Sequence, residues 1–558
     1  MAIELSNLTF TNEDDIVPVS GVEEIVNTGI ANTLAGDDII TGVRDQTRYS
    51  IFNSGTLYTA EGNDIITGAL NQIGDYSFGE NYGIFNDIGG SIDTGDGNDI
   101  INGHTTTGTG NAIANYGSIN TGNDNDIITA TVYSISDYPT NGLFNSGDIN
   151  TGDGNDLITS ITPRDTAIYN VNGTINTGDG NDTITGTVTD PGNGQGINLT
   201  FASLDTEKGN DIITGNGLGV GIYLYDSFFN TGDGNDIITG NSSDGGVSIV
   251  NWGFMDTGSG DDIITGNQTG EGSNSINYNG FGLLNGNGNN LEAFMDTGDG
   301  NDTITGISNA FEGIGLRNDN TINTGNGNDV ITGTGKQYGI LNNEIINTGN
   351  GADSLISNGK LSNYYFSAGV FLGNGNDSII ANANSDRNRA IENFNFIETG
   401  NGDDVITSTG FIYNEGIIET GNGNDSIIVN GSVEGLDTRY GIYNNGGAIN
   451  TGNGNDSIIA NEGFESGSNS SGAWFLGEGE DYIKGYGSGD FYGGNGNDTL
   501  ELTPGTYTVG IWGEGSDTSA IFTKGNQLMI TSEFEKLKAG STIYDFTNLT
   551  AGQIIVVA

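Results

Sequence analysis

The chain has 558 residues, and its 72 acidic and 14 basic residues give a net charge of −58. Binding to nucleic acid or to an anionic membrane is excluded, because both need clusters of Lys and Arg. The absence of Cys excludes a disulfide framework and thiolate metal sites. A hydrophobic share of 34%, with 23 Phe and 22 Tyr, still provides material for a core.

The N-terminal segment, residues 1–30, lacks the repeat that fills most of the chain. Its start, MAIELSNLTFTNEDDIVP, has no basic region followed by a continuous apolar stretch, so no cleavable signal peptide is expected. No stretch of the chain approaches the roughly 20 apolar residues of a transmembrane helix. Because the end of a repeat stack is an open edge that must be covered, residues 1–30 are predicted to form an N-terminal cap.

A turn that ends in Asp recurs eighteen times between residues 31 and 502, at spacings of 17 to 40 residues that average about 27. Two residues after the Asp each copy has Ile or Leu, and seven residues before it each copy has an apolar residue, as at Ile238 and Phe229 around Asp236. Two residues before the Asp, seventeen copies have Gly and one has Asp124. Each copy therefore offers three short strand-like segments that are separated by Gly, Asn and Asp.

These repeats predict the fold class. One copy cannot bury its few apolar side chains alone, whereas stacked copies place Ile over Ile in continuous columns. We expect an all-β protein, a right-handed parallel β-solenoid of about 18 coils with three sides, over residues 31–502. Most copies also carry an apolar pair followed by Asn, as in Ile51-Phe52-Asn53. This Asn is predicted to form a stacked amide ladder and not to bind metal.

The C-terminal segment, residues 503–558, loses the Asn-Asp turns. It holds Lys524, Lys536 and Lys538, and alternating strands are expected at 527–531 and 553–557. This composition predicts a small β-rich C-terminal cap or domain over residues 503–558.

The turn itself, Thr-Gly-Asp/Asn-Gly-Asn-Asp, has the composition of a metal site. Its glycines allow tight curvature, and its Asp carboxylate is expected to point outward at one edge of the coil. Carboxylates stacked ~4.8 Å apart repel one another unless a cation lies between them. Oxygen ligands alone favour Ca²⁺, which accepts six to eight of them. The alternative is that Asn and Asp cap backbone groups at the corners without metal.

The segment from Gly493 to Leu500, GGNGNDTL, matches in full the pattern Gly-Gly-x-Gly-x-Asp-x-apolar. In this the chain resembles the RTX, or hemolysin-type, calcium-binding repeat proteins, in a long-coil variant with one turn per coil where the family has two. The resemblance implies Ca²⁺ between the turns of neighbouring coils, with an extra turn that ends at Asp490. The implied ligands are Asp99, Asp156, Asp182, Asp236, Asp262, Asp302, Asp329, Asp377, Asp404, Asp425, Asp456, Asp481, Asp490 and Asp498.

The resemblance also implies a location and partners. RTX-like proteins are typically exported by type I secretion with an uncleaved C-terminal signal, so an extracellular or cell-surface location is expected. The expected function is that of a calcium-binding structural protein of the cell surface or matrix, which assembles end to end or adheres. Its expected partners are calcium ions, further copies in a filament or surface layer, and an extracellular polysaccharide, with neither nucleic acid nor a transmembrane segment.

The alternative function is a polysaccharide-active enzyme, because parallel β-helices also host uronate lyases, epimerases and glycoside hydrolases. Proton abstraction beside a uronate carboxylate needs a cation and a base. The single histidine, His104, is expected in a solvated loop, and the pairs Arg44 and Arg48, and Arg387 and Arg389, are expected as solvated loop charges. The sequence therefore favours a protein without catalytic activity.

Ice binding is a third class of function, since regular threonines on a flat solenoid face can order water. Two Thr columns recur, one in the turn, as at Thr94, and one after it, as at Thr67. They lie about eight residues apart and not as Thr-x-Thr on one strand, with the acidic turn between them. Ice binding therefore ranks below the enzyme.

Overall fold

The structure is a computed structural model. It describes residues 2–18, 23–44, 48–71, 81–106, 110–133, 140–190, 192–243, 245–271, 280–288, 293–383, 389–431, 440–467, 472–513 and 519–558. The chain divides into two compact units. Unit 1 comprises Met1–Gly298 with Ile307–Ala310, and unit 2 comprises Asp299–Gly306 with Phe311–Ala558.

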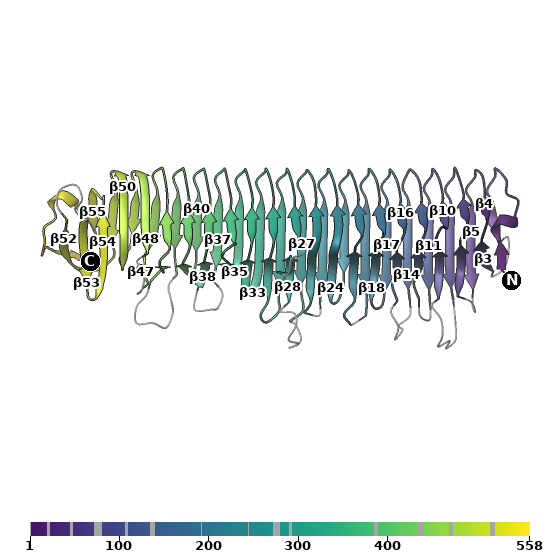
Figure 1. The fold of residues 1–558 in the computed structure, drawn as a ribbon, viewed down its shortest axis with the longest axis horizontal. Coiled ribbons are helices and arrows are strands. Elements are labelled where there is room, and N and C mark those ends of the chain that lie inside the picture. The colour runs from purple at the N-terminus through teal and green to yellow at the C-terminus, as the bar shows by residue number, and fades with distance from the viewer. Residues whose placement is uncertain are drawn as a thin grey trace. The chain divides into compact units, whose positions relative to one another are not determined.

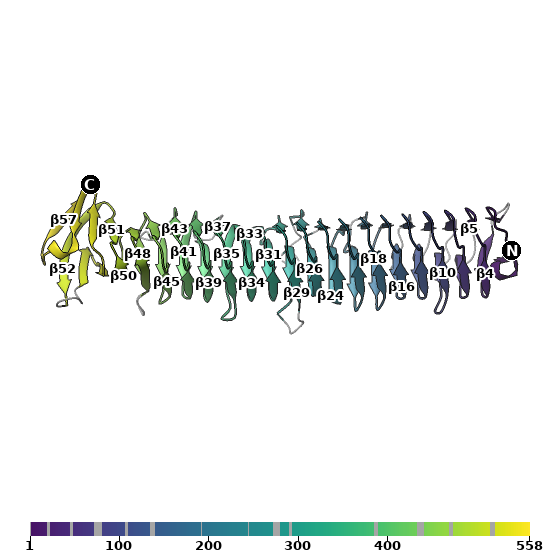
Figure 2. The same cartoon turned by 90° about the horizontal axis from the view of Figure 1, so that it is seen from above.

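Each unit is a stack of coils, and every coil has three sides that we name A, B and C in chain order after the Asp turn. In one coil of unit 1 these are β8 (Ile65–Leu70), β9 (Tyr82–Asn86) and β10 (Ser91–Asp93). Each strand pairs in parallel with its equivalent in the next coil, so that Ile66 lies opposite Ile101. The strands of each unit stand side by side in Figure 1 and form separate layers when seen from above in Figure 2. The predicted all-β parallel solenoid is confirmed.

The strands differ between the three sides in length and position. On side A they are β2 (Ile16–Val17), β5 (Ile39–Arg44), β8, β11 (Ile100–Thr105), β14 (Ile127–Val132), β17 (Leu157–Thr162), β20 (Thr183–Val188), β23 (Ile212–Asn216), β25 (Ile237–Ser242), β27 (Ile263–Gln268), β30 (Thr303–Ser308), β37 (Ser378–Asn382), β40 (Val405–Ser408), β43 (Ser426–Val429), β46 (Ser457–Ala460), β49 (Tyr482–Lys484) and β51 (Thr499–Leu502). On side B they are β1 (Ala2–Glu4), β3 (Glu24–Asn27), β6 (Tyr49–Asn53), β9, β12 (Ile113–Asn115), β15 (Leu143–Asn145), β18 (Thr166–Val171), β21 (Gln195–Thr200), β28 (Phe281–Asn285), β31 (Ile314–Asn318), β38 (Arg389–Asn393), β41 (Phe411–Asn414), β44 (Ile442–Asn444) and β47 (Phe464–Ser466).

On side C they are β4 (Ile30–Asn32), β7 (Thr56–Tyr58), β10, β13 (Ser118–Asn120), β16 (Asp148–Asn150), β19 (Thr174–Asn176), β22 (Ser203–Asp205), β29 (Phe294–Asp296), β32 (Thr321–Asn323), β34 (Ile345–Asn347), β36 (Gly369–Phe371), β39 (Phe396–Glu398), β42 (Ile417–Glu419), β45 (Ala448–Asn450), β48 (Ala473–Gly479) and β50 (Gly489–Gly496). Four longer strands turn a corner without a break. Of these, β33 (Val330–Asn342) and β35 (Ser354–Asn363) join sides A and B, whereas β24 (Val220–Asn230) and β26 (Val247–Asp256) join sides B and C.

The core consists of apolar columns that the repeat predicts. The residue two after each repeat Asp and the residue seven before it are buried in all eighteen copies, including Ile238, Phe229 and Trp474. Gly is required in the turn because the coils approach closely there. A Cβ atom on Gly180 would lie 1.3 Å from the carbonyl oxygen of Gly154 in the preceding coil.

The predicted amide ladder on side B is confirmed. The side-chain amide of Asn27 donates to Asn53 Oδ1 at 2.8 Å, and the amide of Asn53 donates to Asn86 Oδ1 at 2.7 Å. The same Asn53 amide also donates to the carbonyl oxygen of Ser91 at 3.0 Å, which fixes the corner between sides B and C. Apart from Asn27 Oδ1 at the start of the ladder, which has no partner, these buried amides bond to one another and to backbone, so the ladder needs no ligand.

Both ends of the chain are β structure. At the N-terminus β1, followed by the 3₁₀ turn η1 (Leu5–Asn7), pairs in parallel with β3. At the C-terminus β52 (Gly505–Trp512) pairs antiparallel with β53 (Ser519–Lys524) and β57 (Ile554–Val557). The remaining elements there are β54 (Gln527–Ser532), β55 (Lys536–Ala539), β56 (Thr542–Asp545) and the 3₁₀ turn η3 (Phe546–Asn548). Since β54 and β55 pair in parallel with β50 and β51, this segment continues the ladder of unit 2.

Among the described residues no helix is long and apolar enough to span a membrane.

Candidate metal column

The repeat aspartates form one buried column in each unit, at the corner between sides C and A. All eighteen are at most 2% exposed, so the expectation that their carboxylates point outward is wrong. The reason is a hydrogen bond that the repeat spacing does not reveal: Asp64 N donates to Asp99 Oδ1 at 2.7 Å, and Asp99 N donates to Asp126 Oδ1 at 2.8 Å. Each carboxylate thus turns inward to accept the amide of the preceding coil.

A second ladder runs through the turn in the opposite direction. The amide of Asn98 donates to Asn63 Oδ1 at 3.0 Å, and the amide of Asn125 donates to Asn98 Oδ1 at 3.2 Å. Each turn is therefore tied to both neighbouring coils by side chains that accept from backbone amides. This is the capping role that the sequence left open as an alternative, and it uses only one oxygen of each Asp.

The second oxygen of the carboxylate, Oδ2, is the unusual feature of the column. Apart from Asp262 and Asp302, sixteen of the repeat aspartates have a buried Oδ2 without a hydrogen-bond partner. The nearby turn threonine does not supply one, because the Thr94 hydroxyl donates to the carbonyl oxygen of Thr121 at 3.2 Å. A buried, unsatisfied carboxylate oxygen is costly, so the column needs either protons or cations.

Burial also changes the proton affinity of these carboxyls. Desolvation raises the pKa of Asp99 to about 7 and that of Asp126 to about 8, although the hydrogen bond from the backbone amide of the preceding coil opposes the shift. In unit 2, desolvation raises the pKa of Asp377 to about 7, and the neighbouring carboxylates of Asp404 and Asp353 add to it. At ~4.8 Å and an effective dielectric constant near 20, two adjacent charges repel by about 3.5 kcal/mol. The column cannot be fully ionised near neutral pH without positive charge.

The donor chemistry of the column fits calcium. Carboxylate oxygens are hard ligands, and the stack offers one such unpartnered oxygen per coil for these sixteen aspartates. No group of three or more His, Cys, Asp or Glu side chains gathers anywhere in the described part of the chain, so the carboxylates form a line and not a cluster. Further oxygens for a calcium ion would come from backbone carbonyls of the glycine-rich turns, from the turn threonines or from water.

The predicted ligands fall into two groups. Asp490 is not in the column: it lies in β50 opposite Ala473 on side C, partly exposed, and no turn ends at this residue. The other thirteen lie in the columns: Asp99, Asp156, Asp182, Asp236 and Asp262 in unit 1, and Asp302, Asp329, Asp377, Asp404, Asp425, Asp456, Asp481 and Asp498 in unit 2.

Two residues that the sequence analysis missed end the ladders. In unit 1 the amide of Asp15 donates to Asp38 Oδ1 at 2.8 Å, and in unit 2 the amide of Asp498 donates to Glu535 Oε2 at 2.7 Å. Asp15 could have been found, because Asn12-Glu13-Asp14-Asp15-Ile16-Val17 is a degenerate copy of the turn. Glu535 carries no repeat signal, since its place depends on how the C-terminal segment folds back.

The residues considered for an enzyme are placed differently from the expectation. His104 lies in strand β11, partly exposed, with its ring 6.2 Å from that of Tyr133, and not in a loop. Arg48 is exposed, whereas the side chain of Arg44 and the whole of Arg387 lie outside the described residues. Arg389 is not a solvated loop charge, because it lies in β38 with its guanidinium 4.4 Å from the centre of the Tyr413 ring.

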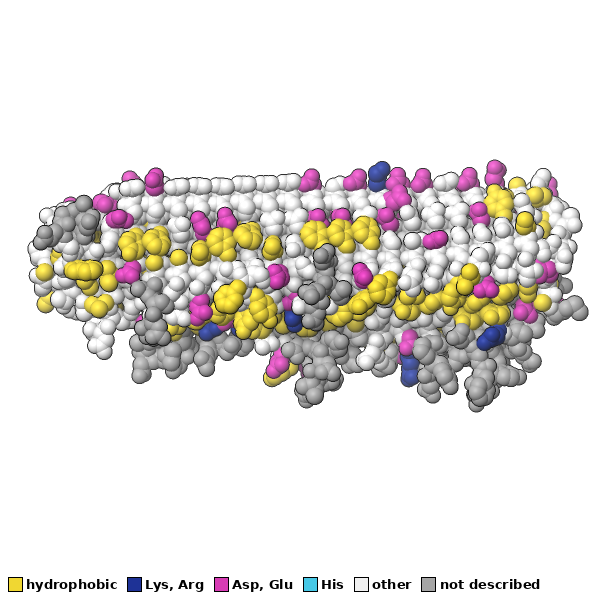
Figure 3. All heavy atoms as spheres, in the orientation of Figure 1, with side chains coloured by type: hydrophobic (Ala, Val, Ile, Leu, Met, Phe, Trp, Pro, Cys, Tyr) yellow, Lys and Arg dark blue, Asp and Glu magenta, His cyan; other side chains and the backbone are white. Residues whose placement is uncertain are grey.

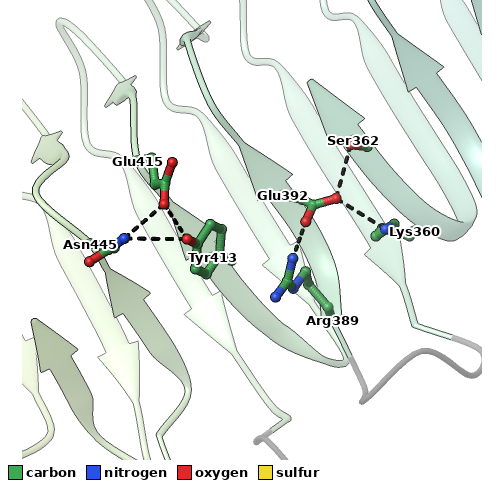
Figure 4. A network of polar contacts seen from close by, with 7 residues as sticks. All are labelled: Lys360, Ser362, Arg389, Glu392, Tyr413, Glu415 and Asn445. Carbon is green, nitrogen blue, oxygen red and sulfur yellow. Dashed lines mark hydrogen bonds and ion pairs between the residues drawn. The ribbon is translucent and has the colours of Figure 1, made fainter. Parts of the chain in front are cut away.

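Arg389 belongs to a polar network on side B of unit 2, drawn in Figure 4. Glu392 is buried and accepts from Arg389, from Lys360 Nζ at 3.0 Å and from the Ser362 hydroxyl at 3.1 Å. Both cations are therefore already paired with one carboxylate. The network joins two neighbouring coils, and it leaves neither cation free to polarise a substrate.

Comparison with known proteins adds little to this picture. No family model and no curated protein matches the chain. One similar solved structure is the crystal structure of a hyperactive, Ca²⁺-dependent, β-helical antifreeze protein from an Antarctic bacterium, at 13% sequence identity and a TM-score of 0.19, over 96% of this chain and 94% of that chain. The fold assignment therefore rests on the strand pairing of this chain itself.

Proposed function

We propose that the protein is a calcium-binding structural β-solenoid of the cell surface or extracellular matrix, and that it acts by presenting surface and not by catalysis. The observation that carries the proposal is the column of buried Asp Oδ2 atoms without partners. A scaffold held by hydrogen bonds alone does not need a carboxylate at this position, because Asn would accept the same backbone amide without a buried charge.

In this proposal the chain and the cation have separate tasks. Oδ1 of each Asp holds the turn of the preceding coil, and Oδ2 is left for the ion, for example at Asp156, Asp182 and Asp236. Bound calcium would supply positive charge between carboxylates that otherwise repel. The coils then stiffen only where calcium is plentiful, which is the case outside cells. Type I secretion and an RTX-like relationship belong to the same proposal.

Assembly end to end is the second part of the proposal. Side strands in the middle of a stack are hydrogen-bonded on both edges, so they cannot add a further strand. The acidic surface also keeps the sides of two copies apart. Contact between copies should therefore use strand edges at the ends of the stacks. The alternative, a polysaccharide-active enzyme, would need a catalytic group outside the Glu392 network.

The test is a calcium titration followed by circular dichroism and hydrodynamic radius. We expect the chain to expand in chelator and to recover its β structure in millimolar Ca²⁺, with Mg²⁺ as the poorer substitute. Asp236→Asn should weaken this response, whereas Asp233→Asn, in the same turn but exposed, should not. Identical spectra and radii in chelator and in calcium would show that the turns need no metal.

Ice binding is a second candidate function, favoured by side A of unit 1. The outward residues there form an uncharged lattice in continuous register, with threonine in eight of nine successive coils. The eight threonine hydroxyls of this column form no hydrogen bond within the described structure, in contrast to the buried Thr94 in the turn. The column comprises Thr41, Thr67, Asn102, Thr129, Thr159, Thr185, Thr214, Thr239 and Thr265.

Two objections from the sequence are weaker for this face. Thr-x-Thr does occur in β14 (Thr129 and Thr131) and in β20 (Thr185 and Thr187), and the repeat Asp is buried and does not interrupt the outward column. Rows repeat every ~4.8 Å along the stack and every ~6.8 Å along a strand, which suits a partner that is periodic in two directions. Ice shaping and thermal hysteresis should be abolished by Thr185→Lys with Thr214→Lys, and retained with Asn176→Lys on side C. Wild-type protein without either activity would exclude this function.

A further inference from the structure

A groove of about 470 Å³ follows the corner between sides B and C in three successive coils of unit 1. Its floor is made of small residues, Ala202, Ser227 and Gly253, one from each coil. A side chain could not be added at the floor, since a Cβ atom on Gly253 would lie 2.3 Å from the carbonyl oxygen of Ser227. The hollow is thus built by the choice of small residues at equivalent positions.

The walls of the groove are aromatic. Phe201 and Trp252 line it together with Phe228 and Phe254, whose rings stack with centroids 5.3 Å apart. Phe201 is 52% exposed and Phe228 is 42% exposed, although side chains of this type are usually covered. Such walls hold an apolar or cationic group through ring contacts. Figure 3 shows that apolar side chains also gather in patches on the surface of the coils.

The repeat departs from its pattern beside this groove. A buried Asn stands at this corner in the coil before the groove, at Asn170, and in the third coil of the groove, at Asn251, but in the first two coils of the groove Leu199 and Leu224 take its place. The amide ladder is therefore interrupted, and β24 runs through the corner with a register shift between Tyr225 and Phe228. Where a repeat protein keeps the same residue in most coils and replaces it locally, the replacement commonly marks a functional site.

The backbone at the groove is also strained. Asn172, Phe201 and Asp226 occupy equivalent corner positions in successive coils and have φ angles of 54°, 51° and 47°, in the left-handed region that Gly and Asn favour and that is unusual for Phe. Strain of this kind persists where the surroundings impose it, and it clusters at binding sites. Here it presents an aromatic ring and a carboxylate at the groove.

The polar atoms of the groove identify the ligand. The hydrogen-bond donors are already used: the Ser227 hydroxyl donates to the Tyr225 carbonyl oxygen at 2.8 Å, and Trp252 Nε1 donates to the Gly286 carbonyl oxygen at 3.1 Å. The Gly253 amide likewise donates to Asn251 Oδ1. What remains is the exposed carboxylate of Asp226. A sugar ring or a peptide needs donors as well as acceptors from its site, whereas an organic cation needs only aromatic rings and negative charge.

We propose that this groove binds a quaternary ammonium group, such as a trimethylammonium head. The cation would contact Trp252 and the neighbouring phenylalanines and be attracted by the Asp226 carboxylate. No Lys or Arg lines the groove. The net charge of −58 raises the local concentration of cations further. This site goes beyond the proposed scaffold function and does not depend on the calcium column.

The test is isothermal titration calorimetry of the full chain in calcium with tetramethylammonium and with choline. Binding should weaken about tenfold in Trp252→Ala, the size expected for loss of a cation–π contact. It should also weaken in Asp226→Asn and at high salt. Phe366→Ala is the matched control, because Phe366 is an exposed aromatic residue (93%) of unit 2 away from the groove. Circular dichroism of each variant checks that the coil stack is intact.

Neutral probes decide the ligand class. The neutral isostere 3,3-dimethylbutan-1-ol and glucose should bind much more weakly than choline. Equal binding of the isostere would overturn the proposal in favour of a purely apolar site, and binding of glucose alone would overturn it in favour of a saccharide site. Absence of ammonium binding by a folded wild-type chain would also overturn it.

Discussion

The turns of the two units share the buried Asp but differ at their exposed edge. Three residues before the repeat Asp, unit 1 mostly carries charge, as at Asp153 and Asp179, whereas unit 2 mostly carries Asn. In unit 2 these amides stack: Asn350 Nδ2 donates to Asn326 Oδ1 at 2.6 Å, and Asn374 Nδ2 donates to Asn350 Oδ1 at 2.6 Å. The ladder continues through Asn401, Asn422 and Asn453.

The turns of unit 2 also form one more backbone hydrogen bond between coils. In unit 2 the amide of Asn350 donates to the Gly325 carbonyl oxygen at 3.0 Å, in addition to the bond from Gly351 N to the Asn374 carbonyl oxygen at 2.7 Å. Asp is an acceptor only and cannot extend such a ladder with another Asp. The exposed position three residues before the repeat Asp therefore forms a neutral amide ladder in unit 2 and a mostly charged edge in unit 1. Unit 1 should therefore depend more strongly on cations.

The largest expected effect tests what the units have in common. Ile238→Asp in unit 1 and Ile427→Asp in unit 2 each place a charge in a fully buried apolar column, at a cost of several kcal/mol. Both should lower the melting temperature by a similar amount, with or without calcium, since the core is the same. A much smaller effect in one unit would show that its core does not support the stack.

The next effect tests where calcium acts. Upon chelation at pH 8, amide hydrogen exchange should accelerate first in the turns of unit 1, around Asp153 and Asp179, and later in those of unit 2. The reason is that the exposed charge of unit 1 adds to the repulsion in the buried column. Equal exchange rates in both units would mean that the Asn ladder does not protect the turns of unit 2 when calcium is removed.

The pH dependence should be alike in both units, because it comes from the shared column. Burial raises the pKa of Asp182 and of Asp329 to about 7, above the value of about 3.9 in an unfolded chain. The folded state then binds more protons, so stability without calcium is fully present below pH 4 and is lost as pH rises through 7. Thermal melts in chelator at pH 5 and pH 8 measure this. Higher stability at pH 8 than at pH 5 would contradict it.

The smallest effect comes from exchanging the two turn edges. Asn374→Asp should destabilise unit 2 by about 1 kcal/mol, since it breaks one rung of the amide ladder and adds an exposed charge. Asp179→Asn should stabilise unit 1 slightly, and this gain should shrink at high salt. Denaturant melts in chelator provide both values. Opposite signs would show that the exposed edge is not what distinguishes the units.

The side A face differs between the units as well. In unit 2 the outward position keeps threonine at Thr305, Thr332 and Thr407, but Ile356, Ile380, Ile428 and Ile459 occupy it in four other coils. A hydroxyl lattice is therefore mainly a property of unit 1. Any ice-binding activity should be lost through changes in unit 1 and not through changes in unit 2.

Much of the fold could be predicted because each coil repeats the same local solution. The apolar positions around Asp236 and the amide at Asn53 recur at fixed distances from the turn, and the structure confirms both. The direction of the Asp side chain could not be predicted, since spacing does not show to which side of a tight turn a carboxylate points. It was decided by the backbone amide of the preceding coil.

The contacts between coils were also hidden from the sequence. Lys360, Arg389 and Glu392 meet because loops of different length bring two coils into register on side B. The groove beside Trp252 depends on a register shift in β24 and on small floor residues in three coils. Such features arise from departures from the repeat, which only the three-dimensional arrangement makes visible.

The most direct test of the calcium column counts protons. Calcium titrated calorimetrically into the full chain at pH 7, in two buffers of different ionisation enthalpy, measures how many protons leave for each ion that binds. We predict binding with proton release, because calcium displaces protons from Asp carboxyls whose pKa burial raises to about 7 or 8, as at Asp99 and Asp126. Asp236→Asn should reduce the number of ions bound, and Asp233→Asn should not. Absence of calcium binding, or binding that releases no protons and is unaffected by Asp236→Asn, would contradict the account.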